Sequence, residues 1–219
     1  MDKKALILAN GRPPKKRLLR SLLKETNFFV CADGGANTAA SLGLKPNLII
    51  GDLDSIRGRA IRKFSRVPAR RINDQNSTDL EKAITYLVRK GFKDIIVIGA
   101  TGGRLDHAVG NLSVLAKFSK AARTKFVDDE AEVSYIGNEF HFEAPKGTIV
   151  SLIPLSLCEG IVTKGLKWEL RNETLELGFR EGTSNKVVSS PVHIRVRRGD
   201  LLLFRVLQEP QSKKRKKKS

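Results

Sequence analysis

The chain has few of the residues that build disulfide-bonded, metal-stapled or membrane-spanning proteins. Its 219 residues include two cysteines, Cys31 and Cys158, no CxxC pair and three histidines, which argues against a disulfide framework or a structural zinc site. We expect both cysteines to be buried free thiols. No apolar run approaches the ~20 residues that span a bilayer, and one of the longest, Ile149–Leu157, is interrupted by Pro154.

A targeting segment is also missing from the sequence as given. Met1 is followed by charged residues and then by a short apolar run that ends at Asn10 and Gly11. That run is too short for the core of a signal peptide, and it lacks a small-residue cleavage site. We therefore predict a cytoplasmic location and no membrane association.

Acidic residues are scarce relative to basic ones, with 23 Asp and Glu against 41 Lys and Arg and a net charge of +18. Such an excess suggests nucleic-acid binding. Six of these charges lie in Lys213–Lys218, within a segment, 209–219, that we expect to be a disordered basic tail. The tail fits RNA, a membrane surface, a nuclear import receptor or a simple gain in solubility. Against a nucleic-acid-binding module, aromatic residues are only 6% and no RNP-type motif is present.

The first half of the chain alternates short apolar runs with amphipathic segments. Such continuous apolar strands alternating with helices are typical of a parallel sheet covered on both faces. The expected strands are Ala5–Ala9, Phe28–Ala32, Leu48–Ile50 and Ile95–Ile98, and the expected helices are Leu18–Leu23, Asn37–Leu42, Thr78–Lys90 and Leu105–Lys120.

Beyond Asn138–Lys146 the helical patterns stop. Short segments separated by Gly, Pro and Asn follow at close spacing, a pattern typical of a β-sandwich. The fold class predicted is therefore α/β: a three-layer parallel-sheet domain over residues 1–138, then an all-β sandwich domain over 146–208. The strands expected in the second domain are Ile149–Ile153, Gly160–Thr163, Lys167–Leu170, Thr174–Leu177, Val187–Val188, Val192–Val196 and Leu201–Val206.

Asp52 and Asp54 follow an expected strand, at the carboxyl edge where open α/β sheets bind ligands. In an extended segment, residues two apart point to one face, so we expect the two carboxylates side by side. Two close anions need a compensating cation, and Mg²⁺ suits one or two carboxylates with phosphate oxygens and water. A turn with Asx-type hydrogen bonds explains the same residues equally well.

A polar run leads into the helix expected from Thr78. Thr78 and Glu81 fit a capping box, which by itself explains the run as a helix start. However, Asp74–Ser77 is richer in polar residues than capping needs, and Lys82 lies where the helix dipole disfavours a cation. A bound phosphate accounts for both features, since helix N-termini and lysine favour anions.

Two glycine-containing clusters follow other expected strands. The glycines of Gly99–His107 let backbone N–H groups approach a ligand closely, and Arg104 suits bidentate contact with phosphate. Asp106 fits either a helix cap or a further site carboxylate. Asp33-Gly34-Gly35 is a common strand-to-helix turn that gains meaning beside the other clusters. The chain has no Walker A or GxGxxG sequence, so a bound nucleotide does not rely on those devices.

The second half offers fewer signals. Trp168 is the only tryptophan and is expected in core packing or in an interface. Gly182–Asn185 forms a small polar segment, for which an ordinary turn is the default interpretation.

Taken together, six short motifs resemble those of thiamine pyrophosphokinases. They occur in that family's order and span both predicted domains. No single motif is decisive, but the six combined are specific. The motifs are CADGGAN (Cys31–Asn37), GDLDSI (Gly51–Ile56), DQNSTDLEKA (Asp74–Ala83), GATGGRLDH (Gly99–His107), GLKWEL (Gly165–Leu170) and TSN (Thr183–Asn185).

The resemblance implies a transferase with ATP and thiamine as substrates and Mg²⁺ as cofactor. The thiamine hydroxyl would attack the β-phosphorus of ATP, giving thiamine diphosphate and AMP. Chemistry of this kind depends on charge neutralisation and in-line positioning. The resemblance also implies a homodimer with sites between subunits, and an α/β domain followed by a β-sandwich.

The resemblance further assigns roles to individual residues. Asp52, Asp54 and Asp79 are implied as metal ligands and catalytic residues, and Asp106 as a catalytic carboxylate that supports them and orients the hydroxyl. The rings of thiamine are implied to meet Ser184, Asn185 and Phe204. Some members have Trp where this chain has Phe204, and a core position fits that residue equally well. The implied nucleotide-binding residues are Asp33, Gly34, Asn37, Gln75, Thr78, Lys82 and Arg104.

Two other functions remain open at the level of sequence. A diphosphokinase acting on another alcohol, such as a pterin, would keep the ATP clusters and change the pocket of the second domain. Of these two acceptors, the GLKWEL and TSN motifs favour thiamine. The alternative from a different class is a nucleic-acid-binding protein, suggested by the net charge alone.

Overall fold

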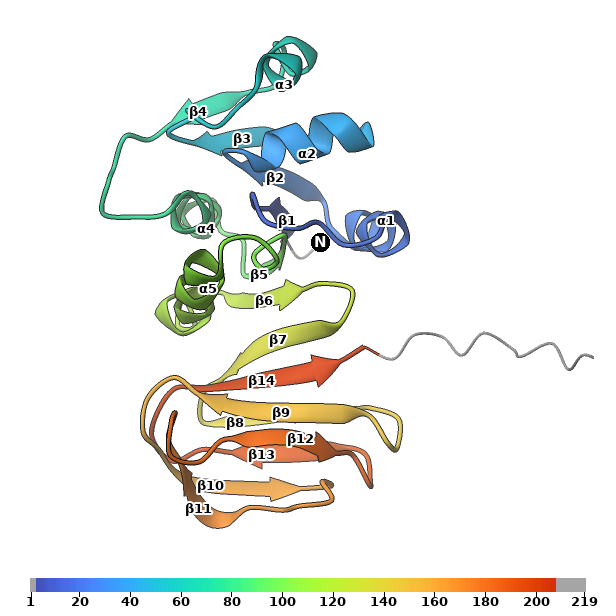
Figure 1. The fold of residues 1–219 in the computed structure, drawn as a ribbon, viewed down its shortest axis with the longest axis vertical. Coiled ribbons are helices and arrows are strands. Elements are labelled where there is room, and N and C mark those ends of the chain that lie inside the picture. The colour runs from blue at the N-terminus through green and yellow to red at the C-terminus, as the bar shows by residue number, and fades with distance from the viewer. Residues whose placement is uncertain (1–2, 208–219) are drawn as a thin grey trace, which may run out of the picture.

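The computed structural model describes residues 3–207, so the predicted basic tail, 209–219, lies outside the described residues. An α/β half occupies one end of the long axis and a β half the other (Figure 1). Within residues 3–207, the helices are all too short or too polar to cross a bilayer.

One ten-stranded sheet runs through both halves, in the order β12-β9-β14-β7-β6-β5-β1-β2-β3-β4 (Figure 1). The six strands from β6 to β4 are parallel, and β6 pairs with β7 in the antiparallel sense. The central strands are buried on both faces, which explains their continuous apolar sequences. The parallel strands are β1 (Lys4–Leu8), β2 (Phe28–Ala32), β3 (Leu48–Gly51), β4 (Ala69–Arg71), β5 (Asp94–Ile98) and β6 (Arg123–Val127).

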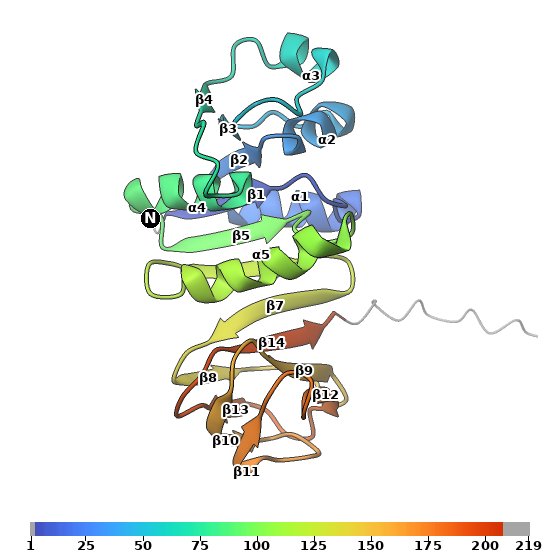
Figure 2. The ribbon, with the colours of Figure 1, turned by 60° about the vertical axis from the view of Figure 1, so that its left-hand side comes forward.

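Helices cover both faces of the parallel strands and complete the predicted three layers. Leu19 and Leu22 of α1 pack with α2 and α3 on one face, whereas Leu80 of α4 and Leu115 of α5 pack on the other. Figure 2 shows α5 lying along the sheet. The helices are α1 (Lys16–Glu25), α2 (Gly35–Leu42), α3 (Gly58–Lys63), α4 (Asp79–Arg89) and α5 (Leu105–Lys117).

The β half is a sandwich, as predicted, but one of its layers is the continuation of the large sheet. Leu201 and Leu203 of that layer pack on Ile161, Val192 and Ile194 of a separate antiparallel sheet, ordered β11-β10-β13-β8. The fold class is thereby confirmed. The strands are β7 (Ala131–Ile136), β8 (Glu139–Phe142), β9 (Ile149–Pro154), β10 (Cys158–Lys164), β11 (Arg171–Leu175), β12 (Gly182–Lys186), β13 (Val192–Arg195) and β14 (Leu201–Val206).

Some expected elements are wrong in position. The expected strand Lys167–Leu170 is a turn that leads into β11, and Val187 forms only an isolated bridge with Leu166. The turn expected at Gly182–Asn185 is also wrong, since these polar residues lie in strand β12. Its pairing with β9 depends on backbone groups and not on apolar alternation. The predicted buried free thiols are confirmed: Cys31 and Cys158 are both buried and free.

Candidate active site

Asp33, Asp52 and Asp54 come together at the carboxyl ends of β2 and β3. Each offers a carboxylate oxygen that lies within 4.8 Å of the others'. The three carboxylates range from buried (Asp33) to exposed (Asp54), so the cluster is open to solvent on one side. The structure thus adds Asp33 to the predicted aspartate pair.

The Asp52-Leu53-Asp54 segment is a turn and not the extended stretch expected from the sequence. Leu53 has a φ of 68°, and the backbone N–H of Asp54 donates to Oδ1 of Asp52 at 3.2 Å. Ser55 Oγ donates to Oδ1 of Asp54 at 3.0 Å. The Asx-type turn and the gathering of carboxylates therefore occur together and do not exclude each other.

Asp33 is the least accessible member of the cluster, with 3% of its surface exposed. Burial raises the pKa of its carboxyl, and the nearby Asp79 and Asp52 charges add to the rise. Its Oδ1 atom is buried and has no hydrogen-bond partner among the described residues. A buried carboxylate oxygen without a donor, beside two other carboxylates, has the character of a cation ligand.

Asp79 approaches the cluster from the first turn of α4. Its Oδ1 accepts from the backbone N–H of Asp52 at 3.3 Å and from Lys82 Nζ at 3.0 Å. A Cβ at position 51 would lie 2.9 Å from both Asp79 Oδ1 and Asp33 Cβ, so Gly51 is what allows these two side chains to flank β3. Lys82 is buried and its charge faces the aspartates.

Asn37 of α2 holds the loop that carries Asp54. Its Nδ2 donates to the carbonyl of Ser55 at 2.8 Å, and its Oδ1 accepts from the N–H of Arg57 at 2.8 Å. Gly34, at the start of the same helix, leaves space for Asn10, because a Cβ there would lie 2.4 Å from the Asn10 side chain. Asn10, which follows β1 by two residues, was not predicted because it belongs to none of the six motifs.

The polar run before α4 has a structural role and borders a basic cavity. Thr78 and Glu81 form the predicted capping box. Hydrogen bonds from Ser77 and from the N–H of Asn76 lower the pKa of Asp74, whereas Gln75 is exposed.

A cavity of about 460 Å³ adjoins this polar run and was not predicted from the sequence. Its lining includes four cations, and the residues are Arg70, Ile72, Asp74, Ser77, Lys82, Thr85, Tyr86, Arg89 and Lys90.

Asp106 stands apart from the Asp33, Asp52 and Asp54 cluster. Arg104 donates to both of its oxygens, at 3.1 Å from Nε and 2.5 Å from Nη2. These hydrogen bonds lower the pKa of Asp106 to about 2. Both side chains are mostly exposed at the start of α5. In this arrangement Arg104 offers its charge to Asp106 rather than to an open phosphate site.

The predicted thiamine contacts lie in the β half. Asn185 is buried, and its side-chain amide bonds both the N–H and the carbonyl of Trp168, at 3.1 and 2.7 Å. Ser184 is exposed, with a φ of 58°, and Phe204 is half-buried on β14. Trp168 is 53% exposed with Lys167 Nζ 4.6 Å from its ring centre, so core packing is wrong for this residue and the interface alternative stays a prediction.

The two groups of predicted residues are far apart within one chain. Five strands separate β14 from β3 in the large sheet. At about 4.8 Å per strand the two lie on the order of 29 Å apart. Figure 1 shows β14 and β3 well apart in the molecule. A single small molecule therefore cannot contact both Phe204 and Asp54 of the same copy.

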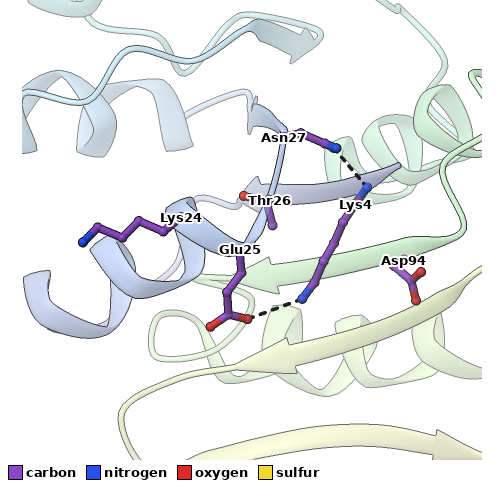
Figure 3. Close-up of a pocket in the computed structure, with 6 residues that line it drawn as sticks. All are labelled: Lys4, Lys24, Glu25, Thr26, Asn27 and Asp94. Atoms are coloured by element: carbon purple, nitrogen blue, oxygen red, sulfur yellow. Dashed lines mark hydrogen bonds and ion pairs between the residues drawn. The ribbon is translucent and has the colours of Figure 1, made fainter. Parts of the chain in front are cut away.

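Two other cavities lie away from the aspartate cluster. One of about 480 Å³ lies at the amino ends of β1 and β5, the edge opposite the aspartates (Figure 3). There Lys4 is paired with Glu25 at 3.4 Å. Another, of about 680 Å³, lies where β6 and β7 diverge, and its lining includes Arg123 and Tyr135.

Comparisons with known proteins identify the family. Residues 19–127 match the catalytic domain of thiamin pyrophosphokinase, and residues 137–201 match its vitamin B1 binding domain. The chain belongs to the thiamine pyrophosphokinase family. The suspected resemblance is therefore confirmed, and with it the assignment of the chain as an enzyme.

Individual relatives agree across nearly the whole chain. Thiamine pyrophosphokinase 1 of Oryza sativa subsp. japonica is 32% identical over 220 residues, which cover 87% of this chain and 82% of the relative. Thiamine pyrophosphokinase of Bacillus subtilis (strain 168) is 27% identical over 91% of this chain and 96% of its own. Thiamin pyrophosphokinase from Candida albicans shares the fold, with a TM-score of 0.83 over 94% of this chain and 90% of that one, at 19% identity.

Proposed function

We propose that the chain transfers a diphosphate group from ATP to the hydroxyl of thiamine, giving thiamine diphosphate and AMP. The observation that carries this proposal is the aspartate cluster at the strand ends, in a chain of the thiamine pyrophosphokinase family. The hydroxyl oxygen would bond to the β-phosphorus while the bond from that phosphorus to the α-β bridging oxygen breaks. The hydroxyl releases its proton and AMP leaves.

The residues present fit Mg²⁺ as the cofactor. Mg²⁺ prefers carboxylate oxygens together with substrate phosphates and water. Oδ1 of Asp33 is a buried carboxylate oxygen without a hydrogen-bond partner among the described residues, so it is available as a ligand. We propose that Asp52 and Asp54 hold the ion with Asp33, which the sequence had assigned to the nucleotide. Asp79, predicted as the third metal ligand, stays a prediction in that role; its Oδ1 accepts from the N–H of Asp52 and from Lys82. When bound, the ion would neutralise phosphate charge. The aspartates supply the oxygen ligands, and Gly51 sets their spacing.

The cationic surroundings support a polyphosphate at this edge. Lys82 Nζ is held 3.0 Å from Asp79 Oδ1, and Arg70 lines the cavity beside it. Such fixed positive charge stabilises the phosphate oxygens as charge shifts toward the leaving group. Gln75, Thr78 and Arg104 stay predicted nucleotide contacts.

We further propose a homodimer that builds each active site from two copies. The separation of Phe204 from Asp54 within one chain requires it if both serve one thiamine molecule. Apolar surface is available for the contact, since Leu105 and Val109 of α5 are 77% and 61% exposed. A second copy covering α5 would remove that surface from water. A cytoplasmic location stays a prediction.

The reaction is tested by incubating the full chain with ATP, thiamine and Mg²⁺ and separating the nucleotides. We expect AMP and thiamine diphosphate in equal amounts. ADP as the nucleotide product, or no turnover, would contradict the proposal. A panel of other alcohols, pterins included, tests the acceptor with the same AMP measurement.

The shared site is tested by mixing two inactive variants. Asp54→Asn removes a carboxylate from one copy, and Phe204→Ala together with Ser184→Ala alters the thiamine side of the other. Mixed dimers would contain one site with neither change, so mixing and re-equilibration should restore activity. Continued inactivity of the mixture, with dimers exchanging subunits, would contradict a site built between copies.

A further inference from the structure

Two of the chain's three histidines face each other across the second sheet of the sandwich. His141 of β8 pairs with His193 of β13, and their ring centres are 5.7 Å apart. Glu139 lies two residues before His141, on the same side of β8. Ligand atoms from these three residues all lie within 4.8 Å of one another. This grouping was not predicted, because the two histidines are far apart along the chain.

The three side chains are available to a ligand. All are exposed. Among residues 3–207, none of the three side chains makes a hydrogen bond or ion pair, and the two imidazole rings lie against each other. Their neighbours on this face are two cations, since Arg195 pairs with Glu139 across β8 and β13, and Lys164 pairs with His193 across β10 and β13.

We propose that Glu139, His141 and His193 bind a divalent transition-metal ion of the Zn²⁺ class. Two imidazoles and one carboxylate are a common three-ligand set for Zn²⁺, with water in the fourth position. Bond lengths near 2.0–2.2 Å require ligand atoms closer than 4.8 Å. Small rotations of the three exposed side chains would bring their ligand atoms within bonding distance of one ion. Imidazole nitrogen also suits Ni²⁺ and Cu²⁺, so the class is set by the ligands rather than by one metal.

This site is separate from the aspartate cluster in place and in chemistry. The strands β8 and β13 lie in the β half, whereas α2 and β3 lie at the other end of the molecule (Figure 1). An all-carboxylate cluster favours Mg²⁺, while imidazoles favour Zn²⁺ over Mg²⁺. Excess Mg²⁺ therefore occupies the first site and leaves the second for Zn²⁺.

A bound ion would join an edge strand to its neighbour. Within the part of the chain that the structure describes, β8 is the edge strand of its sheet and pairs with β13. Coordination by residues of both strands would hold that edge in register, and binding to the folded state alone raises the free energy of unfolding. The role proposed is thus a stabilising clamp and not a part of the phosphate chemistry.

The experiment uses the full chain without an affinity tag, in excess Mg²⁺, titrated with Zn²⁺. Imidazole ¹H–¹⁵N correlations report each histidine, and His107 of α5 serves as an internal reference. We expect the His141 and His193 signals to move together while that of His107 stays. In competition with a chromophoric chelator, His141→Gln and His193→Gln should each weaken Zn²⁺ binding at least about tenfold, with His107→Gln as the matched control.

Two further variants sharpen the result. Arg195→Gln removes a cation opposite Glu139 and should tighten Zn²⁺ binding, since like charges nearby disfavour a cation. Glu139→Gln should weaken it. Unmoved His141 and His193 signals, equal movement of all three histidines, or unchanged affinity in His193→Gln would each overturn the proposal. Thermal unfolding in chelator checks that the variants fold, since the replaced side chains are exposed.

Discussion

Lys82 Nζ lies 3.0 Å from Asp79 Oδ1, and the lysine side chain is only 4% exposed. The same Asp79 oxygen also accepts a hydrogen bond from the backbone N–H of Asp52. Lys82 thus fixes Asp79, and Asp79 in turn fixes the start of the Asp52–Asp54 turn. A cation in the first turn of a helix, unfavourable by itself, is explained by this acid partner as well as by phosphate.

Replacing Lys82 by methionine keeps the side chain's bulk and removes its charge. We expect the free energy of unfolding to fall by about 1–3 kcal/mol, since Asp79 loses its charged partner in a partly buried place. We also expect kcat to fall, because Asp79 and the turn lose their fixed position. Urea unfolding and AMP formation measure the two effects. Lys120→Met, on an exposed lysine outside the site, is the control, and an equal loss in both variants would contradict the argument.

Asp54→Asn should lower kcat by about 10²–10³-fold while the fold stays intact. Asp54 is exposed and its Oδ1 accepts a hydrogen bond from Ser55 Oγ, which an amide oxygen can also accept, so the fold tolerates an amide. AMP formation at saturating Mg²⁺ measures the loss, and circular dichroism checks the fold. Glu143→Gln, an exposed carboxylate in the β half, should leave turnover near normal. Normal turnover in Asp54→Asn would show that the metal assignment is wrong.

Asp33 links stability to pH. Its folded pKa is raised above the ordinary value of 3.8, so the folded state holds this proton more tightly than the unfolded state does. The stability that this adds is present below pH 3.8 and is lost as pH rises through the folded pKa, unless a cation is bound. Asp33→Asn removes the free-energy cost of holding an ionised carboxylate in this buried place beside Asp79 and Asp52.

We therefore expect Asp33→Asn to stabilise the metal-free protein at pH 7, by about 0.5–2 kcal/mol, and to abolish activity. The advantage over the parent should shrink as pH falls toward 3.8. Added Mg²⁺ should raise the Tm of the parent and leave that of the variant unchanged. A variant that is less stable than the parent at pH 7 without metal would contradict this account of Asp33.

How far the sequence predicts this site depends on which forces position each residue. The buried strands β1, β2, β3 and β5 and the capped helix α4 follow from apolar runs and local capping. The extended conformation predicted for Asp52–Asp54 is wrong, because the segment forms a turn. That turn depends on the left-handed backbone of Leu53 and on hydrogen bonds of Asn37 of α2 with the following residues. Both features depend on contacts between segments that are distant in sequence, which a local strand pattern does not predict.

The β half was harder to predict for a related reason. β12 is polar, and its place beside β9 is set by backbone pairing, so no apolar alternation marks it. The continuation of one sheet through both halves depends on the β6–β7 pairing, which joins two segments of ordinary composition. The opposed His141 and His193 likewise depend on the register of β8 against β13.

Asn185 and Ser184 are adjacent but should respond differently to substitution. Asn185→Ala removes the side-chain bonds to Trp168 and to the N–H of Lys186, so we expect about 1–3 kcal/mol of lost stability. Ser184→Ala leaves the fold unchanged and should raise the KM for thiamine. Denaturant unfolding and initial rates over a thiamine series separate the two. A KM effect in Asn185→Ala with unchanged stability would instead favour direct contact with thiamine.

The exposed apolar side chains of α5 give a direct test of assembly. Val109 is 61% exposed and lies one turn beyond Leu105 on α5, the helix that a second copy would cover in the proposed dimer. Val109→Asp would place a charge in that contact, and we expect the protein to sediment as a monomer and to lose most activity. Ile61→Asp is the matched control, because Ile61 is 59% exposed on α3, which covers the other face of the sheet. Analytical ultracentrifugation across a concentration series, with AMP formation measured on the same samples, links assembly to turnover. A fully active Val109→Asp monomer would show that one copy completes the site alone.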